Sequence, residues 1–294
     1  MLDLDPARPG APLRDAATLI VIREAFGGAS GLELFCVERQ KMGFLGGAVV
    51  FPGGKLDPAD LDPAWAGRAT PMREAGAALA EGPEQLRGLG VAACREALEE
   101  AAILPLAGTS LGHATLLTWR ARLARTRERP AETTLLALLN DADVKVDLSA
   151  LHPLARWVTP VAESRRFDAR FFLYVADAAL TGAHDEYETT ASFWAAPSEV
   201  LRRFAAGELQ LAPPTHRTLE MLAMAASPSA ALAMAAAASL EPVCPRLVKH
   251  ADGRGETIAL ALPGDREHEA GHVITPGRSR YVLRGDRFLP EDAP

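Results

Sequence analysis

Three glutamates stand close together in the stretch Arg95-Glu96-Ala97-Leu98-Glu99-Glu100. Glu96, Glu99 and Glu100 are spaced i, i+3 and i+4, so a helix would project all three side chains from one face. Like charges at this spacing repel each other, and a bound cation relieves the repulsion. Because the ligand atoms are all oxygens, the expected cation is hard Mg²⁺ or Mn²⁺ rather than zinc. These residues alone also fit a solvated acidic helix face, the usual use of glutamate runs.

The glutamates are expected on an amphipathic helix that follows an irregular segment. From Val91 to Ile103 apolar residues recur at helical spacing, and Pro105 prevents the helix from continuing. Residues 55–90 mix Asp, Pro, Gly and Ala, which predicts a long excursion with one short helix near residues 72–80. A strand and a turn before this excursion complete the surroundings of the helix.

The strand is expected at residues 48–51, and Pro52-Gly53-Gly54 after it predicts a turn. Apolar runs at residues 16–22 and 32–37, separated by a glycine-rich stretch, predict a hairpin. Beyond about Ser227 the chain is alanine-rich and then punctuated by Gly and Pro, and we interpret it as an appendage with short strands. Further strands are expected at 157–159, 171–176 and 192–195, and further helices at 116–125, 132–139, 197–207 and from 213.

The segment around the glutamates resembles the Nudix hydrolase motif, G-x5-E-x7-R-E-U-x-E-E-x-G-U, where U is a bulky aliphatic residue. The resemblance implies that Glu96, Glu99 and Glu100 hold divalent metal ions that bridge the diphosphate of a substrate. It also implies that Arg95 fixes the geometry of the loop, and that Glu100 and Glu96 are central to catalysis. The matching positions are Gly54, Arg95, Glu96, Glu99, Glu100 and Ile103.

The motif is interrupted and altered in this chain. Gly54 and Arg95 lie 41 positions apart where the family pattern has 14, so 27 extra residues fall inside it, about residues 61–90. Asp60 stands where the first glutamate belongs and is a candidate to pair with Arg95. Ala102 replaces a glycine that ends the helix, where a left-handed turn favours Gly by about 1 kcal/mol.

An insertion at this point resembles one branch of the family, the peroxisomal coenzyme A diphosphatase-like proteins and their bacterial relatives. This resemblance covers about residues 14–225 and implies cleavage of coenzyme A or acyl-coenzyme A to 3′,5′-ADP and 4′-phosphopantetheine. The coenzyme A signature has an arginine where Gly43 stands, so NADH, ADP-ribose and other nucleoside diphosphate derivatives stay open as substrates. The segments that carry the resemblance are 47–54, 166–172, 188–190 ahead of Trp194, and 211–215.

Residues outside the helix complete the predicted site. Enzymes of this family often take a general base or a further metal ligand from another loop, and Glu188 is the candidate, with a solvated loop acid as the alternative. Guanidinium groups make paired hydrogen bonds to phosphate oxygens, so cations near the motif are candidates for substrate binding. The predicted substrate-binding residues are Arg39, Gly53, Gly54, Lys55, Arg166 and Arg170.

Composition limits the classes of partner and metal site that the protein is expected to have. A net charge of -7 argues against nucleic acid as a partner and leaves a small-molecule diphosphate as the expected one. Three cysteines without C-x-x-C spacing predict neither a zinc site nor a disulfide framework. We recognise no secretory signal, membrane span or peroxisomal tripeptide, so a cytoplasmic enzyme is expected, and a homodimer is left open.

The expected fold is α+β, an α/β/α sandwich with a mixed sheet flanked by helices. The resemblance implies a Nudix domain at residues 14–225 and an appendage at residues 226–294. Two other function classes stay open from the sequence. One is a non-catalytic nucleotide-binding regulatory module, which the changes at Asp60 and Ala102 would allow. The other is an interaction protein whose appendage forms a partner surface. The appendage could equally pack on the domain, complete a dimer or shape the substrate mouth.

Overall fold

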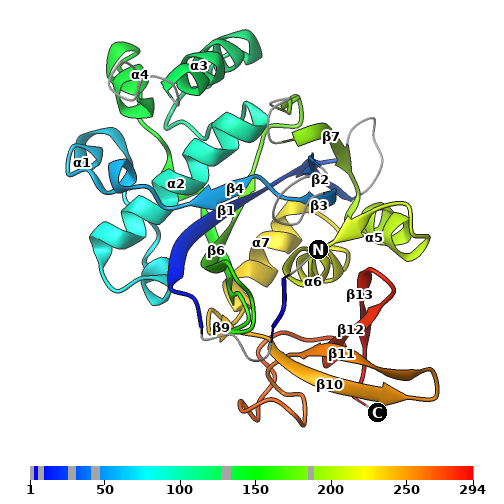
Figure 1. The fold of residues 1–294 in the computed structure, drawn as a ribbon. Helices are drawn as coiled ribbons and strands as arrows, with labels where there is room; N and C mark the ends of the chain where they lie inside the picture. The colour runs from blue at the N-terminus through cyan, green and yellow to red at the C-terminus, as the bar shows by residue number, and fades with distance from the viewer. Residues whose placement is uncertain are drawn as a thin grey trace.

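The structure is a computed structural model that describes residues 3–5, 10–25, 31–40, 47–126, 134–184 and 189–293. Over these ranges the chain forms a large mixed sheet with helices on both faces and a separate antiparallel sheet near its C-terminus (Figure 1). The predicted sandwich of a mixed sheet between helices is therefore confirmed, as are the short strands at the C-terminal end.

Strand β1 (Leu13–Glu24) organises the main sheet. It pairs in parallel with β6, while its first half pairs with β4 and its second half with β2, both antiparallel. The predicted hairpin is the β1–β2 pair, with Ile22 opposite Leu34. Among the described residues the strand order is β8-β3-β2-β1-β6-β5-β9, and β7 pairs with β2. The other strands are β2 (Leu32–Arg39), β3 (Ala48–Val50), β4 (Gly53–Lys55), β5 (His152–Val158), β6 (Arg166–Val175), β7 (Thr189–Ala195), β8 (Gln210–Leu211) and β9 (Pro242–Val243).

Alternation along β1 gives the sheet two apolar faces. Leu19 and Val21 pack into a core with α2, α3 and α4, and Ile20 and Ile22 pack into a second core with α5, α6 and α7. The helices therefore cover both faces of the sheet (Figure 1). Their bounds are α1 (Trp65–Arg68), α2 (Pro83–Ala101), α3 (His113–Thr126), α4 (Leu135–Asp141), α5 (Pro197–Ala205), α6 (Pro213–Leu222) and α7 (Pro228–Ala237).

The structure corrects the start of the motif helix. Helix α2 begins at Pro83, eight residues before the predicted Val91. A 3₁₀ turn at 58–61 precedes the inserted segment, which holds α1 and a second 3₁₀ turn at 74–79. Glycine lowers helix propensity, which hides this first part of the helix in the sequence pattern. Gly90 is needed there because a Cβ at that position would lie 2.8 Å from the Met72 sulfur of the insertion. The insertion thus packs directly on α2.

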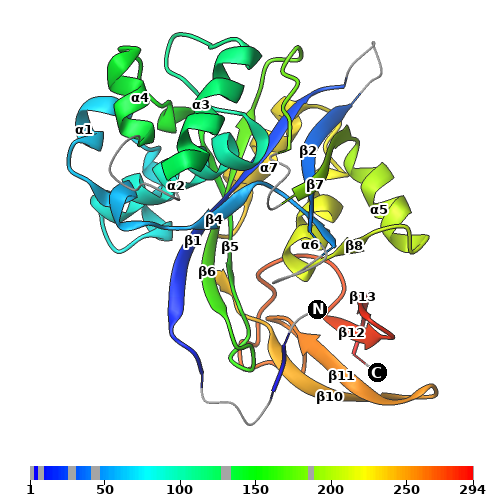
Figure 2. The same cartoon turned by 45° about the horizontal axis from the view of Figure 1, so that its top comes forward.

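The C-terminal sheet consists of β10 (Arg246–Asp252), β11 (Gly255–Ala261), β12 (Arg280–Arg284) and β13 (Arg287–Glu291) in sequential antiparallel order. Before it, α7 packs on the main sheet and β9 pairs with β5. Figure 2 shows this second sheet beside α6, on the side away from α1 to α4. A division of the chain at residue 225 stays a prediction. Among the described helices, none has the length and apolar character needed to cross a bilayer.

Candidate active site

The last two turns of α2 lie against β4, so residues far apart in the sequence meet. Gly53 and Gly54 of β4 pair with Thr18 and Ala17 of β1, and this pairing holds the glycine backbone in the sheet. A Cβ on Gly54 would lie 2.3 Å from the Glu96 carboxylate oxygen Oε1. Glycine at this position therefore makes the space that the glutamate side chain occupies.

Arg95 ties the 3₁₀ turn at 58–61, β4 and α2 together. Its guanidinium donates two hydrogen bonds to Asp60 at 2.9 Å each, one to Glu96 at 2.8 Å and one to the Lys55 carbonyl at 3.0 Å. The Glu99 carboxylate is 3.5 Å away. Burial alone would lower the pKa of Arg95, but the hydrogen bonds to Asp60 and the nearby carboxylate charges outweigh it and raise the pKa. Asp60 is thus paired with Arg95, as the sequence suggested, and Arg95 remains a fixed cation.

Glu100 is the most enclosed of the three glutamates. It is 2% exposed, and its carboxylate accepts a hydrogen bond of 3.0 Å from the backbone N–H of Gly53. The guanidinium of Arg39, at the end of β2, lies 4.0 Å from the other carboxylate oxygen. Glu100 therefore joins α2 to both β4 and β2.

The donor set fits a hard divalent cation. All ligand atoms offered by the three glutamates are oxygens, which suit Mg²⁺-type ions. The local net charge is also negative, since the described carboxylates outnumber the cations beside them. A further cation is therefore attracted to this cluster. The carboxylates are those of Asp57, Asp60, Glu96, Glu99 and Glu100, and the cations are Arg39, Lys55 and Arg95.

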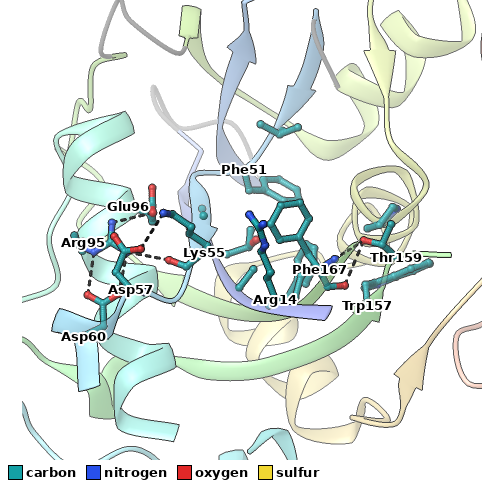
Figure 3. Close-up of a pocket in the computed structure, with 18 of the residues that line it drawn as sticks. Arg14, Phe51, Lys55, Asp57, Asp60, Arg95, Glu96, Trp157, Thr159 and Phe167 are labelled. Atoms are coloured by element: carbon teal, nitrogen blue, oxygen red, sulfur yellow. Dashed lines mark hydrogen bonds and ion pairs between the residues drawn. The ribbon is translucent and has the colours of Figure 1, made fainter. Parts of the chain in front are cut away.

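A cavity of about 1020 Å³ opens beside this cluster. In Figure 3 the cluster of Asp57, Asp60, Arg95 and Glu96 lies at one side of the cavity, and Trp157, Thr159 and Phe167 lie at the other. Between the two sides, the cavity is lined by alternate residues of β1 and β6, whose side chains share one face of the sheet. These residues are Arg14, Ala16, Thr18, Phe167, Ala169 and Phe171. One end is therefore polar and charged, and the other is lined by aromatic rings.

The C-terminal part of the chain completes the wall of the cavity. Pro245 and Leu260 line it, together with the start of α6. The buried Tyr281 hydroxyl of β12 donates to the Pro213 carbonyl at 3.3 Å and lies 3.0 Å from Nδ1 of His216. Pro213 itself lines the cavity. The second sheet therefore fixes a segment that borders the candidate site.

The structure gathers most, but not all, of the predicted site residues. Glu100 does not line the cavity, but it accepts a hydrogen bond from Gly53, which does. Glu188 lies outside the described residues. Arg170 is 2% exposed and bonded to Asp15, Asp168 and the Leu79 carbonyl, and Arg166 donates to the carbonyls of Thr159 and Ala11. Neither arginine is among the cavity-lining residues. The predicted residues that line it are Arg39, Gly53, Gly54, Lys55, Arg95, Glu96 and Glu99.

Sequence reasoning missed several lining residues. Arg14, Arg165 and Phe167 border the cavity, and no motif singled out Arg14 or Arg165. The signal that brings them together is the parallel register of β1 and β6, in which Arg14 lies opposite Phe167. Such a pairing between distant strands is not visible in either segment alone.

Known proteins resemble this chain over most of its length. A family model described as the NUDT19 Nudix domain matches residues 83–222. The acyl-coenzyme A diphosphatase NUDT19 of Homo sapiens is 30% identical, and the match covers 81% of this chain and 72% of that protein. The chain belongs to the Nudix hydrolase family. The enzyme of the same name from Gallus gallus is 28% identical, over 95% of this chain and 85% of its own.

A solved structure agrees with this Nudix assignment. The NUDIX hydrolase from Alicyclobacillus acidocaldarius superposes with a TM-score of 0.63 at 30% identity, covering 76% of this chain and 96% of that one. This chain is accordingly a Nudix diphosphatase, and its family generally works with divalent metal ions.

Proposed function

We propose that this Nudix hydrolase cleaves the diphosphate of coenzyme A or acyl-coenzyme A, giving 3′,5′-ADP and 4′-phosphopantetheine or its acylated form. The observation that carries the proposal is the likeness to the human acyl-coenzyme A diphosphatase NUDT19 over 81% of this chain. The cavity of about 1020 Å³ beside the carboxylates supports it, because this volume suits a ligand much larger than a diphosphate.

Glu96, Glu99 and Glu100 are the proposed metal ligands, and Mg²⁺ or Mn²⁺ is the proposed ion. Their oxygen-only donor set and the excess of carboxylates beside them support this assignment. When bound, such ions neutralise phosphate charge and lower the pKa of the attacking water. Arg95 holds Glu96 and the Lys55 carbonyl in place, so it acts as a positioning residue.

Substrate phosphates are proposed to contact Arg39, Lys55 and the backbone of Gly53 and Gly54. Arg39 and Lys55 line the cavity next to the carboxylates, and the glycines allow a close approach of the ligand to the main chain. Arg166 and Arg170 are left out of this proposal because their guanidinium groups are bonded elsewhere.

Glu188 is the proposed general base or additional metal ligand. The support comes from Thr189, the next residue, which pairs with Arg39 in the β2–β7 ladder. Arg39 in turn lies 4.0 Å from Glu100. A carboxylate is a suitable acceptor for the proton of the attacking water.

A substrate panel tests the proposed activity. The protein is incubated with Mg²⁺ or Mn²⁺ and with coenzyme A, an acyl-coenzyme A, NADH, ADP-ribose or nucleoside triphosphates, and products are separated by chromatography. We expect the highest kcat/KM with coenzyme A or its thioester, and no turnover after chelation of the metal. Preference for NADH or ADP-ribose would move the assignment to another nucleoside diphosphate derivative. Absence of turnover with every compound would contradict the catalytic proposal and favour a nucleotide-binding module.

The setting of the enzyme is part of the proposal. We infer a reducing cytoplasmic compartment, because Cys36, Cys94 and Cys244 form no disulfide. A small-molecule substrate is proposed as the partner, with neither nucleic acid nor membrane involved. A homodimer stays a prediction that the sedimentation behaviour of the purified protein would test.

A further inference from the structure

Two guanidinium groups line the cavity without an internal partner. Arg14 lies in β1, and Arg165 directly precedes β6; both are exposed to solvent. In the described part of the chain, neither side chain forms an ion pair or a hydrogen bond with another residue. Figure 3 shows Arg14 between the carboxylate cluster and the group of Trp157, Thr159 and Phe167.

The neighbouring ends of β1 and β6 place both arginines at the same cavity. Arg14 lies opposite Phe167 in the parallel β1–β6 pair, and Arg165 is two residues before Phe167. Arg165 lies in the bend directly before β6. All three residues line the cavity. The result is two cations next to an aromatic ring.

The nearest acids do not neutralise these cations. Asp15 and Asp168 alternate onto the opposite face, where Asp15 accepts from Arg170 and Gln85 and Asp168 accepts from Arg156. The Glu163 carboxylate is buried and accepts backbone N–H bonds from Asp3 and Ser164. The positive charge of Arg14 and Arg165 is therefore left for a ligand in the cavity.

The distance along β1 suits a nucleoside. Thr18 pairs with Gly53, whose backbone N–H donates to Glu100, and Arg14 lies four residues earlier on the same strand as Thr18. At about 3.3 Å per residue, these backbone positions are about 13 Å apart. A ribose and its base can therefore lie between the diphosphate and a second anion, with Phe167 available for stacking on the base.

We propose that Arg14 and Arg165 bind a second phosphate of the substrate, a phosphomonoester on the nucleoside ribose, apart from the diphosphate that is cleaved. The proposal rests on the proposed function, since the 3′-phosphate of coenzyme A is such a group. Contacts to a phosphate far from the reacting atoms act alike in ground and transition states, so they change KM rather than kcat.

Kinetics with paired substrates test the subsite. Wild type, Arg14→Gln, Arg165→Gln and the control Arg266→Gln are assayed on coenzyme A and on 3′-dephospho-coenzyme A. Arg266 is also exposed but does not line the cavity. We expect wild type to prefer coenzyme A at least about tenfold, and each of the two cavity variants to raise KM for coenzyme A about tenfold. Their kinetics on the dephospho compound should match wild type, as should Arg266→Gln on both.

A binding measurement separates the subsite from the proposed activity. Adenosine 3′,5′-bisphosphate and 5′-AMP are titrated calorimetrically into the same four proteins. The subsite predicts at least about tenfold tighter binding of the bisphosphate to wild type, and loss of this difference in the two cavity variants. Equal binding of the two nucleotides to wild type would overturn the subsite even if coenzyme A is hydrolysed. Failure to hydrolyse coenzyme A, with the binding difference intact, would overturn only the proposed activity.

Discussion

The pairing of Asp60 with Arg95 shows how a shorter acid can occupy a position that the Nudix pattern gives to glutamate. The 3₁₀ turn at Pro58–Leu61 places Asp60 where both its carboxylate oxygens reach the guanidinium at 2.9 Å. One of these oxygens also accepts from the Asp57 backbone N–H at 2.9 Å. The 3₁₀ turn therefore brings the shorter aspartate side chain within reach of Arg95. The change from glutamate to Asp60 preserves the position of Arg95 and does not indicate a lost active site.

At the same scale, Gly54→Ala should abolish most of the activity. The new Cβ would lie 2.3 Å from Glu96 Oε1, so the carboxylate must move away from its present position. We expect kcat/KM to fall by about 100-fold, the size of effect seen when a single electrostatic group is displaced. Gly67→Ala is the matched control, because nothing lies within 4 Å of its added Cβ. Equal activity of Gly54→Ala and wild type would refute the placement of Glu96.

Among the elements, the end of α2 carries the clearest departure from the family pattern. Ala102 adopts φ 53° and ψ 40°, the left-handed conformation of a glycine cap, although it has a Cβ. Its N–H donates to the Leu98 carbonyl, and the Ile103 N–H donates to the Ala97 carbonyl. The helix thus ends as the glycine in the motif would end it, with the backbone strain tolerated by alanine.

The consequence can be measured by comparing two buried alanines of the same region. Ala92→Gly, inside α2, should lower the free energy of unfolding by about 2 kcal/mol, through lost helix propensity and a lost methyl group. Ala102→Gly loses a methyl group but relieves about 1 kcal/mol of left-handed strain, so its net effect should be near zero. Both residues are fully buried. Similar destabilisation of the two variants in urea unfolding would contradict this explanation.

Sequence patterns predicted the elements better than their contacts. The glutamate helix followed from local spacing, because periodicity is a local property. The turn predicted at Gly53 and Gly54 was wrong, since both glycines lie in strand β4 and pair with β1, a contact between distant segments. The early start of α2 was missed because Gly90 is there for the insertion packed on it, a tertiary reason. For a related reason, the sequence did not reveal Arg14 as a cavity residue, and it predicted substrate binding by Arg170, which does not line the cavity. The register of β1 and β6 decides which of these arginines faces the cavity and which faces Asp15.

On the scale of the whole molecule, the C-terminal sheet acts on the cavity through Tyr281. Tyr281→Phe removes the hydroxyl that contacts both the Pro213 carbonyl and His216. We expect KM to rise several-fold with kcat nearly unchanged, and stability to fall by about 1–2 kcal/mol because buried partners lose a hydrogen bond. Tyr174→Phe, in the core on the other face of the main sheet, should leave KM unchanged. An unaltered KM in Tyr281→Phe would contradict an effect of the second sheet on substrate binding.

The same sheet should lose stability in acid. Hydrogen bonds from Arg284 and from the Arg254 backbone lower the pKa of Asp252 to about 2, and Arg284 also lowers the pKa of Glu291. A carboxyl with a depressed folded-state pKa contributes stability above its unfolded value near 4 and loses it as pH falls through the folded value. Arg284→Gln should therefore be less stable than wild type above about pH 4, and the gap should close toward pH 2.

Urea unfolding at a series of pH values measures this gap. Arg266→Gln serves as the control, since this exposed arginine lies outside the ion-pair group of Asp252, Arg284 and Glu291. A difference between wild type and Arg284→Gln that stays constant from pH 6 to pH 2 would rule out the proposed linkage.

The central claim is that the three glutamates of α2 hold the metal that activates diphosphate hydrolysis. The most direct measurement is a Mg²⁺ and Mn²⁺ titration of coenzyme A hydrolysis by wild type, Glu100→Gln and Glu84→Gln. Glu84 is an exposed residue of the first turn of the same helix and is the matched control. We predict that Glu100→Gln lowers kcat by at least about 100-fold and needs more metal for half-activation, while Glu84→Gln matches wild type. Wild-type metal activation and turnover in a folded Glu100→Gln variant would contradict the claim.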